Sequence, residues 1–145
     1  MTKNELYNIR YIRIEIARIN SRIESLEAAA EQTVAGSGNG RSSGISDKVG
    51  NNAAKIADLK TLLEKHKNKI EAEECAVMRF LSELENARLR LIIQLFFVDC
   101  KSWQEVAAII GGDETENSCK QYFKRKMAIY ETEQQTAVLK ELKND

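Results

Sequence analysis

The sequence of 145 residues contains no proline, three cysteines, one histidine and one tryptophan. Without proline nothing forces a break in a helix, and Ala, Glu, Lys, Leu, Ile and Arg, which favour helices, are abundant. We therefore expect an all-α fold. Cys75, Cys100 and Cys119 lie far apart and form no C-x-x-C pair, so the sequence predicts neither a disulfide framework nor a zinc site.

Long apolar runs are also absent. No stretch of about 18 apolar residues occurs, and the chain does not open with the basic segment, apolar block and cleavage site of a secretory signal. We expect a soluble cytoplasmic protein with reduced thiols and no membrane partner. The formal net charge is zero, which argues against a generally basic coat for nucleic acid.

Two regular apolar stripes occupy the first 85 residues. The first alternates steps of three and four, as in a coiled coil, and comprises Ile9, Ile12, Ile16, Ile19, Ile23, Leu26 and Ala30. The second comprises Val49, Ile56, Leu59, Leu63, Ile70, Val77, Phe80 and Leu84. Together they predict a long antiparallel helical hairpin over residues 1–85, and dimerisation through the same stripes is the alternative geometry.

Residues 34–47 separate the two stripes and hold four of the seven glycines and four serines. This composition predicts a mobile hairpin loop, after which Ser46 or Asp47 caps the second helix. The segment GSGNG also suggests a phosphate-binding loop. The Lys and Ser/Thr that a Walker loop requires after its last glycine are missing, so we favour the hairpin loop.

Residues 86–128 follow a different pattern, with a broad apolar face suited to a small globular core. Residues 99–101 interrupt it. Ser102 and Glu105 then form a capping box, and Gly111 and Gly112 end the short helix that it begins. A third helix begins after Asp113 or Thr115, with a basic outward face. Helix, glycine turn and basic helix together predict a helix-turn-helix module, followed by a helical extension over residues 129–145.

The segment LRLIIQLFFVDCKSWQEVAAIIGG, residues 89–112, resembles the helix-turn-helix of sigma-factor region four, with its K-S-W-x-E box and glycine turn. The resemblance implies that the helix starting at Ser102 supports the DNA backbone and that the helix after Thr115 contacts bases. The turn GGDETENS departs from the usual pattern, because it is longer and more acidic.

A wider resemblance covers nearly the whole chain. SSGISDKVGN, residues 42–51, followed by AAKIADL, is similar to a loop found in small phage and prophage proteins of Gram-positive bacteria. That family has coiled helices before a C-terminal helix-turn-helix and is likened to ArpU-type late transcription regulators. The resemblance implies a phage-encoded DNA-binding regulator acting in the bacterial cytoplasm.

The predicted DNA contacts lie on the third helix of the module. Residues 118–127 carry four basic groups and no acidic one. Lys120, Lys124 and Arg125 suit phosphates, while Asn117, Ser118 and Gln121 suit base edges because amides and hydroxyls both donate and accept hydrogen bonds. So few charges bind weakly alone, and we expect a homo-oligomer, most simply a dimer, or RNA polymerase to supply further contacts.

Other residues permit further interpretations. Trp103 is an anchor at the edge of the core or a stacking platform for single-stranded bases, and His66 is a stripe residue or a ligand. The acidic group at residues 71–74 suggests a solvated face more than a metal site. Cys119, near a helix start, is a packing residue or a redox thiol of lowered pKa.

No catalytic set is visible, so we expect neither an enzyme nor a cofactor or metal. Two other functions remain open. The chain is alternatively a coiled-coil interaction protein that binds a host or phage protein, or the DNA-recognition subunit of a phage packaging motor.

Overall fold

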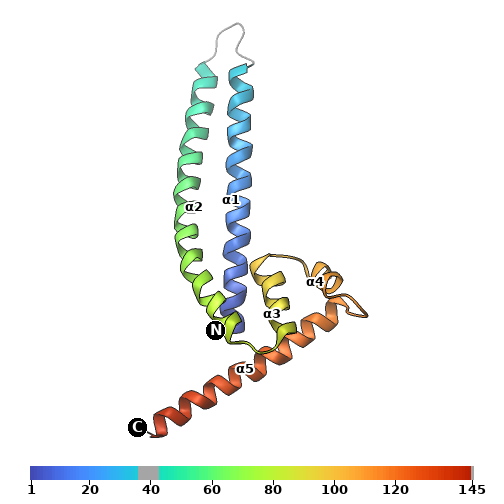
Figure 1. Cartoon of the computed structure of the whole chain (residues 1–145). Coiled ribbons are helices and arrows are strands. Elements are labelled where there is room, and N and C mark those ends of the chain that lie inside the picture. Colours follow the sequence, from blue (N-terminus) through green and yellow to red (C-terminus); the bar gives the residue numbers. More distant parts are fainter. Residues whose placement is uncertain (36–42, 145) are drawn as a thin grey trace. The chain divides into compact units, whose positions relative to one another are not determined.

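The computed structural model describes residues 1–35 and 43–144, and every regular element within these ranges is helical (Figure 1). The expected all-α fold class is confirmed. The elements are α1 (Lys3–Ala35), α2 (Ser43–Glu83), α3 (Ala87–Ile93), the π-helix η1 (Gln94–Val98), α4 (Trp103–Ile110) and α5 (Glu116–Asn144).

The helices reach further into the glycine- and serine-rich segment than the sequence predicts. α1 continues to Ala35 and α2 begins at Ser43, so the predicted caps Ser46 and Asp47 lie inside α2. A glycine inside a helix costs only about 1 kcal/mol relative to alanine, which a helix of 41 residues without proline tolerates. The GSGNG segment, residues 36–40, lies outside the described residues.

The chain divides into two compact units. One consists of Met1–Arg13 and Ala72–Asp145, and the other of Ile14–Glu71. The sequence placed all of residues 1–85 in a single hairpin. In the structure both ends of this segment group with the C-terminal helices, although the regular stripe of α1 runs through residue 13 without a change in spacing.

In the unit Ile14–Glu71, segments of α1 and α2 run antiparallel and pack through their apolar stripes (Figure 1). Ile19, Ile23 and Leu63 are buried, and partly buried apolar side chains surround them. Two ion pairs report the direction of the helices, since Glu15 meets His66 at 3.4 Å and Glu27 meets Lys60 at 3.2 Å. From one pair to the next the residue number rises along α1 and falls along α2, as antiparallel helices require.

The other unit holds most of the buried side chains. Its centre is a cluster of aromatic rings contributed by α1, η1, α4 and α5, namely Tyr7, Phe96, Phe97, Trp103 and Phe123. Aliphatic side chains buried around them include Leu6, Ile9, Ile92, Ile93, Val106 and Met127. The broad apolar face predicted over residues 89–98 is therefore a core face, as expected.

The predicted interruption at residues 99–101 is a tight helix end. The Asp99 amide donates to the Gln94 carbonyl at 2.9 Å, and the Lys101 amide donates to the Leu95 carbonyl at 3.0 Å. Cys100 adopts a left-handed conformation with φ of 55°. These bonds close the last turn of η1 on the carbonyls of its first two residues, and the chain then turns toward α4.

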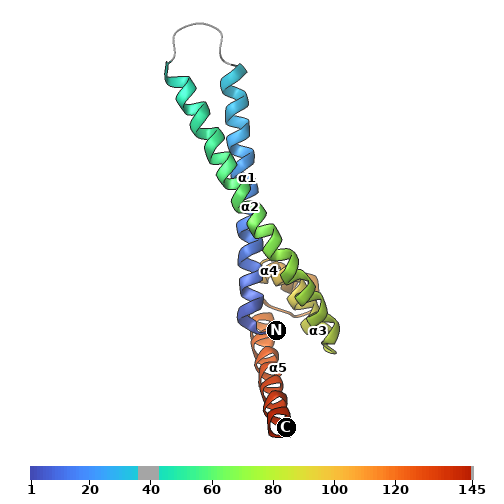
Figure 2. The same ribbon diagram turned by 90° about the vertical axis from the view of Figure 1, so that its left-hand side faces the viewer.

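The C-terminal part of α5 continues beyond this core (Figure 2). The sequence separated residues 129–145 as an extension, but one uninterrupted helix crosses that boundary. Its apolar side chains are exposed there, and they are Ile129, Val138, Leu139 and Leu142.

Candidate nucleic-acid interface

α4 is fixed at both ends as its sequence predicts. The Glu105 amide donates to the Ser102 hydroxyl at 3.2 Å, and the Ser102 amide donates to the Glu105 carboxylate at 2.7 Å. This backbone hydrogen bond from Ser102 lowers the pKa of Glu105. At the other end the Gly111 amide donates to the Ala107 carbonyl at 3.0 Å, and Gly111 and Gly112 take φ values of 78° and 68°.

Trp103 packs against the core. Its ring stacks on Phe96 with centroids 4.0 Å apart, and the Arg10 guanidinium lies 3.9 Å from the centroid of the Phe96 ring. Arg10 also donates to the carbonyls of Phe96 and Lys101. With its ring half-buried against Phe96, Trp103 suits an anchor between α1, η1 and α4 better than an open stacking platform.

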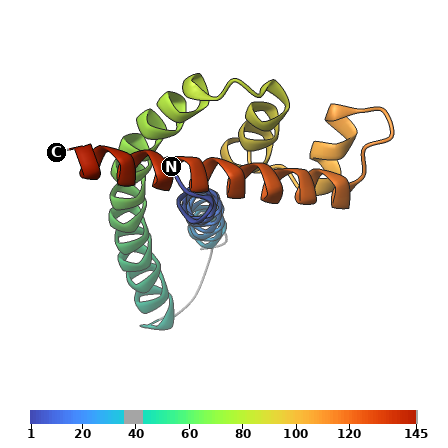
Figure 3. The same cartoon turned by 90° about the horizontal axis from the view of Figure 1, so that it is seen from below.

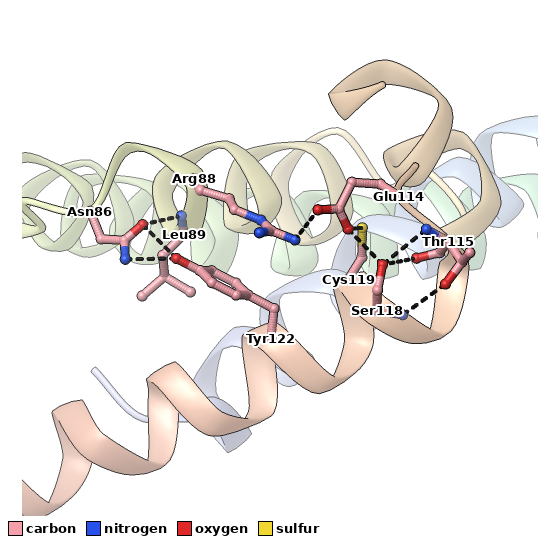
Figure 4. Close-up of polar contacts among 8 residues, drawn as sticks. All are labelled: Asn86, Arg88, Leu89, Glu114, Thr115, Ser118, Cys119 and Tyr122. Atoms are coloured by element: carbon pink, nitrogen blue, oxygen red, sulfur yellow. Dashed lines mark hydrogen bonds and ion pairs between the residues drawn. The ribbon is translucent and has the colours of Figure 1, made fainter. Parts of the chain in front are cut away.

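The acidic turn before α5 is organised by hydrogen bonds (Figure 4). The Ser118 amide donates to the Thr115 hydroxyl at 3.1 Å, and the Thr115 amide donates to the Ser118 hydroxyl at 2.9 Å. Thr115 therefore caps α5, one of the two caps expected from the sequence. The Ser118 hydroxyl also donates to the Glu114 carboxylate at 2.5 Å.

Glu114 ties this turn to α3, since its carboxylate forms an ion pair with Arg88 (Figure 4). The hydrogen bond from Ser118 and the positive charge of Arg88 lower the pKa of Glu114. Glu114, one of the acids that make this turn unlike the sigma-factor pattern, is thus a structural partner of Arg88. Neither residue is predicted from the sequence, because an ion pair between residues 26 positions apart leaves no periodic signal.

A second link joins the start of α3 to α5. The Arg88 guanidinium lies 4.1 Å from the centroid of the Tyr122 ring, and the Asn86 side-chain amide donates to the Tyr122 hydroxyl at 2.8 Å. The same Asn86 side chain caps α3 by accepting from the Leu89 amide at 2.9 Å (Figure 4). One asparagine therefore fixes the beginning of α3 and holds it to α5.

The six predicted contact residues fall into two groups. Four are exposed on α5, and these are Asn117, Gln121, Lys124 and Arg125. The other two already have partners, since Ser118 closes the cap with Thr115 and Glu114, and the Lys120 amine forms an ion pair with Glu116. The position of Ser118 three residues after Thr115 is the sequence signal for this capping role.

The exposed residues share one side of α5. Positions 117, 121, 124, 125 and 128 follow helical spacing, and the buried residues Cys119, Phe123 and Met127 lie on the opposite side. The helix therefore presents two amides and two cations outward from a fully buried anchor.

Cys119 belongs to that anchor. It is fully buried and its thiol lies 3.7 Å from the Glu114 carboxylate. Burial, together with the negative charge of Glu114, raises the pKa of the Cys119 thiol. The sequence allowed a lowered pKa for this thiol, and that possibility is wrong because burial and the neighbouring carboxylate raise its pKa.

The other titratable groups singled out in the sequence lie in ordinary surroundings. Within the described part of the chain, no three His, Cys, Asp or Glu side chains are arranged to hold a metal ion. Glu74 forms an ion pair with Arg13, and His66 lies beside Glu15. No helix in the described ranges is long and apolar enough to cross a bilayer.

Comparison of the chain with protein-family models, with curated proteins and with solved structures finds no match.

Proposed function

We propose that the protein is a phage-encoded, DNA-binding transcription regulator in which α4 and α5 form a helix-turn-helix like that of sigma-factor region four. In this proposal α5 enters the major groove and α4 supports it from above the DNA backbone. The antiparallel segments of α1 and α2 form a helical hairpin, which serves as an arm for dimerisation or partner binding in the bacterial cytoplasm.

The observation that carries the proposal is the two-sided character of α5. Over residues 119–127 its inner side is fully buried, so this part of the helix cannot turn to hide its outer residues. Lys124 and Arg125 then supply phosphate contacts, and Asn117 and Gln121 supply hydrogen bonds to base edges. An amide in particular matches the donor and acceptor that adenine presents in the major groove.

The two remaining predicted residues take narrower roles. Ser118 fixes the turn, because a base contact by its hydroxyl would cost its hydrogen bond to Glu114. Lys120 contributes at the edge of the surface, where its amine is shared with Glu116. With so few free cations, a second copy of the chain or RNA polymerase supplies additional affinity.

The test is duplex binding measured by fluorescence anisotropy at about 50 mM salt, where phosphate contacts are strong. We expect Lys124→Glu with Arg125→Glu to abolish binding while the circular dichroism spectrum stays helical. The matched control is Lys67→Glu with Lys69→Glu, two exposed lysines of α2, which leaves binding nearly unchanged. Equal binding by the α5 variant and the wild type would remove the assignment.

The exposed apolar residues of α5 favour a second candidate, an interaction protein without sequence-specific DNA binding. Val138, Leu139 and Leu142 are 53%, 58% and 70% exposed. This candidate predicts no duplex binding at low salt and a defined host or phage protein partner that is lost in Val138→Asp with Leu142→Asp. A wild-type protein that binds duplex DNA, and whose Lys124→Glu/Arg125→Glu variant does not, contradicts it.

A further inference from the structure

The first turns of α1 carry an exposed polar face that the proposed contacts on α5 do not use. Lys3, Asn4, Tyr7, Asn8 and Tyr11 line a shallow, open depression of about 420 Å³. Asn4 and Asn8 are exposed, and Tyr11 is 59% exposed although it is a large aromatic residue. Tyr11 therefore contributes little to the core, and the face combines amide and phenol donors.

This face lies beside α5. Figure 3 shows the start of α1 next to α5. The Lys3 amide donates to the Glu131 carboxylate at 2.5 Å, and the Tyr7 and Phe123 ring centroids are 6.5 Å apart. On α5, Glu131 shares one side with Lys120 and Lys124, because the three positions are separated by four and seven residues. The start of α1 therefore borders the side of α5 that carries these two lysines.

The charges around the face favour a polyanion. Lys3 lies in the depression and Lys120 and Lys124 on the neighbouring side of α5, while no acid lines the depression. Of these cations Lys120 is paired with Glu116, and Glu131 accepts only the backbone amide of Lys3, so the attraction for a polyanion comes mainly from the side chains of Lys3 and Lys124. Burial raises the pKa of Tyr7, the partly buried phenol in the same face, so its hydroxyl stays protonated.

We propose that Asn4, Asn8 and Tyr11 form a second contact surface for the backbone of the same DNA duplex that α5 binds, an inference that rests on the proposed function. Much of the hydrogen bonding between proteins and DNA goes to phosphate oxygens, and asparagine and tyrosine are among the usual donors. With α5 in the major groove, the adjacent α1 face meets the flanking strand. These donors are neutral, so they add affinity without releasing counterions.

The experiment compares the full-length wild type with Asn4→Ala/Asn8→Ala/Tyr11→Ala on a fluorescein-labelled duplex of mixed sequence, about 30 base pairs or three turns long. We expect binding to weaken by roughly tenfold to a hundredfold, as the loss of two or three hydrogen bonds implies. The slope of log K against log salt concentration stays that of the wild type. In Lys124→Gln/Arg125→Gln, by contrast, the slope itself becomes shallower, because cations are lost.

The matched control is Asn51→Ala/Asn68→Ala/Met78→Ala, which removes two exposed amides and one large exposed side chain from α2. Circular dichroism and thermal unfolding establish that both triple variants keep the fold. An α1 variant within about twofold of wild-type affinity overturns this inference while the proposed function stands, and so does a shallower salt slope. A wild type that does not bind the duplex overturns both.

Discussion

Glu114 has more structural partners than any other acid in the described part of the module. Its carboxylate accepts from the Ser118 hydroxyl, pairs with Arg88 and lies beside the Cys119 thiol. Its lowered pKa means that the folded state favours the ionised form. The turn before α5 is therefore held by a charge whose presence depends on pH.

The pH dependence follows from the direction of that shift. A carboxyl whose folded pKa lies below its ordinary value of 4.5 stabilises the fold above that value, and the stabilisation is lost as pH falls through the folded pKa. We expect wild-type stability to decline below about pH 5. Urea unfolding between pH 3 and pH 7, followed by circular dichroism, measures this decline.

The matched variant is Glu114→Gln, which retains an acceptor for Ser118 but has no charge for Arg88. It should be less stable than the wild type at neutral pH and approach it in acid. Glu5 and Glu105 also have lowered pKa values and continue to titrate in both proteins, so the difference between the two curves isolates Glu114. If the free energies of unfolding of the two proteins changed in parallel with pH, the ion pair between Glu114 and Arg88 would contribute nothing to stability.

Phe123 gives the corresponding test of the core. Its side chain is fully buried, with ring centroids 5.0 Å from Phe97 and 6.1 Å from Trp103. Phe123→Ala should lower the free energy of unfolding by about 3 to 5 kcal/mol, because it leaves a cavity among packed rings. Ile129→Ala, on the same helix but 51% exposed, should change it by no more than about 0.5 kcal/mol in denaturant titrations.

At the scale of elements, local signals predicted where the helices near the C-terminus begin and end. The capping box of α4, the glycines after it and the Thr115 cap of α5 all depend on residues within four positions of one another, so the sequence displays them. The contacts between Arg88 and Glu114 and between Asn86 and Tyr122 depend on chain segments brought together by folding. No spacing rule predicts these contacts.

The same limit applies to the first turns of α1. Ile9 and Ile12 belong to the regular stripe, yet they are buried in the unit that contains α3 to α5. The available signal was Leu6 and Tyr7, two core-forming residues outside that stripe at the start of the helix. Leu6 is fully buried and the Tyr7 ring packs against Phe97, whereas a narrow coiled-coil face would leave both positions outside its stripe.

The glycines after α4 provide a prediction at this scale. Gly111 and Gly112 have positive φ values, and an added Cβ would meet no atom within 4 Å at either. Alanine there costs backbone strain without a clash, roughly 1 to 3 kcal/mol at Gly111, whose ψ of −170° is a region that only glycine occupies readily. Thermal unfolding of Gly111→Ala should show this loss.

Gly50 is the control, since it lies inside α2 with equally open surroundings. Gly50→Ala should raise stability by about 0.5 to 1 kcal/mol, because alanine loses less backbone entropy in a helix. Stabilisation by both substitutions would show that the turn does not require glycine.

For the whole molecule, the two compact units differ in how much they bury. The unit Ile14–Glu71 has few buried side chains, centred on Ile19, Ile23 and Leu63. The unit of Met1–Arg13 and Ala72–Asp145 contains the aromatic cluster and most of the buried residues. Local stability follows buried apolar contacts, so the two units should open independently at different free energies.

Hydrogen–deuterium exchange with mass spectrometry tests this difference. Amides of residues 89–97 and 119–127 should exchange more slowly than those of residues 16–30 and 52–68, although all are helical. Uniform protection would mean that the chain unfolds as one cooperative body.

The central claim is that the outer face of α5 contacts duplex DNA. The most direct measurement places the photoreactive residue p-benzoylphenylalanine at position 121, or at position 67 of α2 as control, and irradiates each protein with a labelled duplex. The account predicts a protein–DNA adduct from position 121 that disappears when Lys124→Glu and Arg125→Glu are added, and none from position 67. Equal adduct formation from both positions, or none from position 121 under conditions where the duplex is bound, would contradict it.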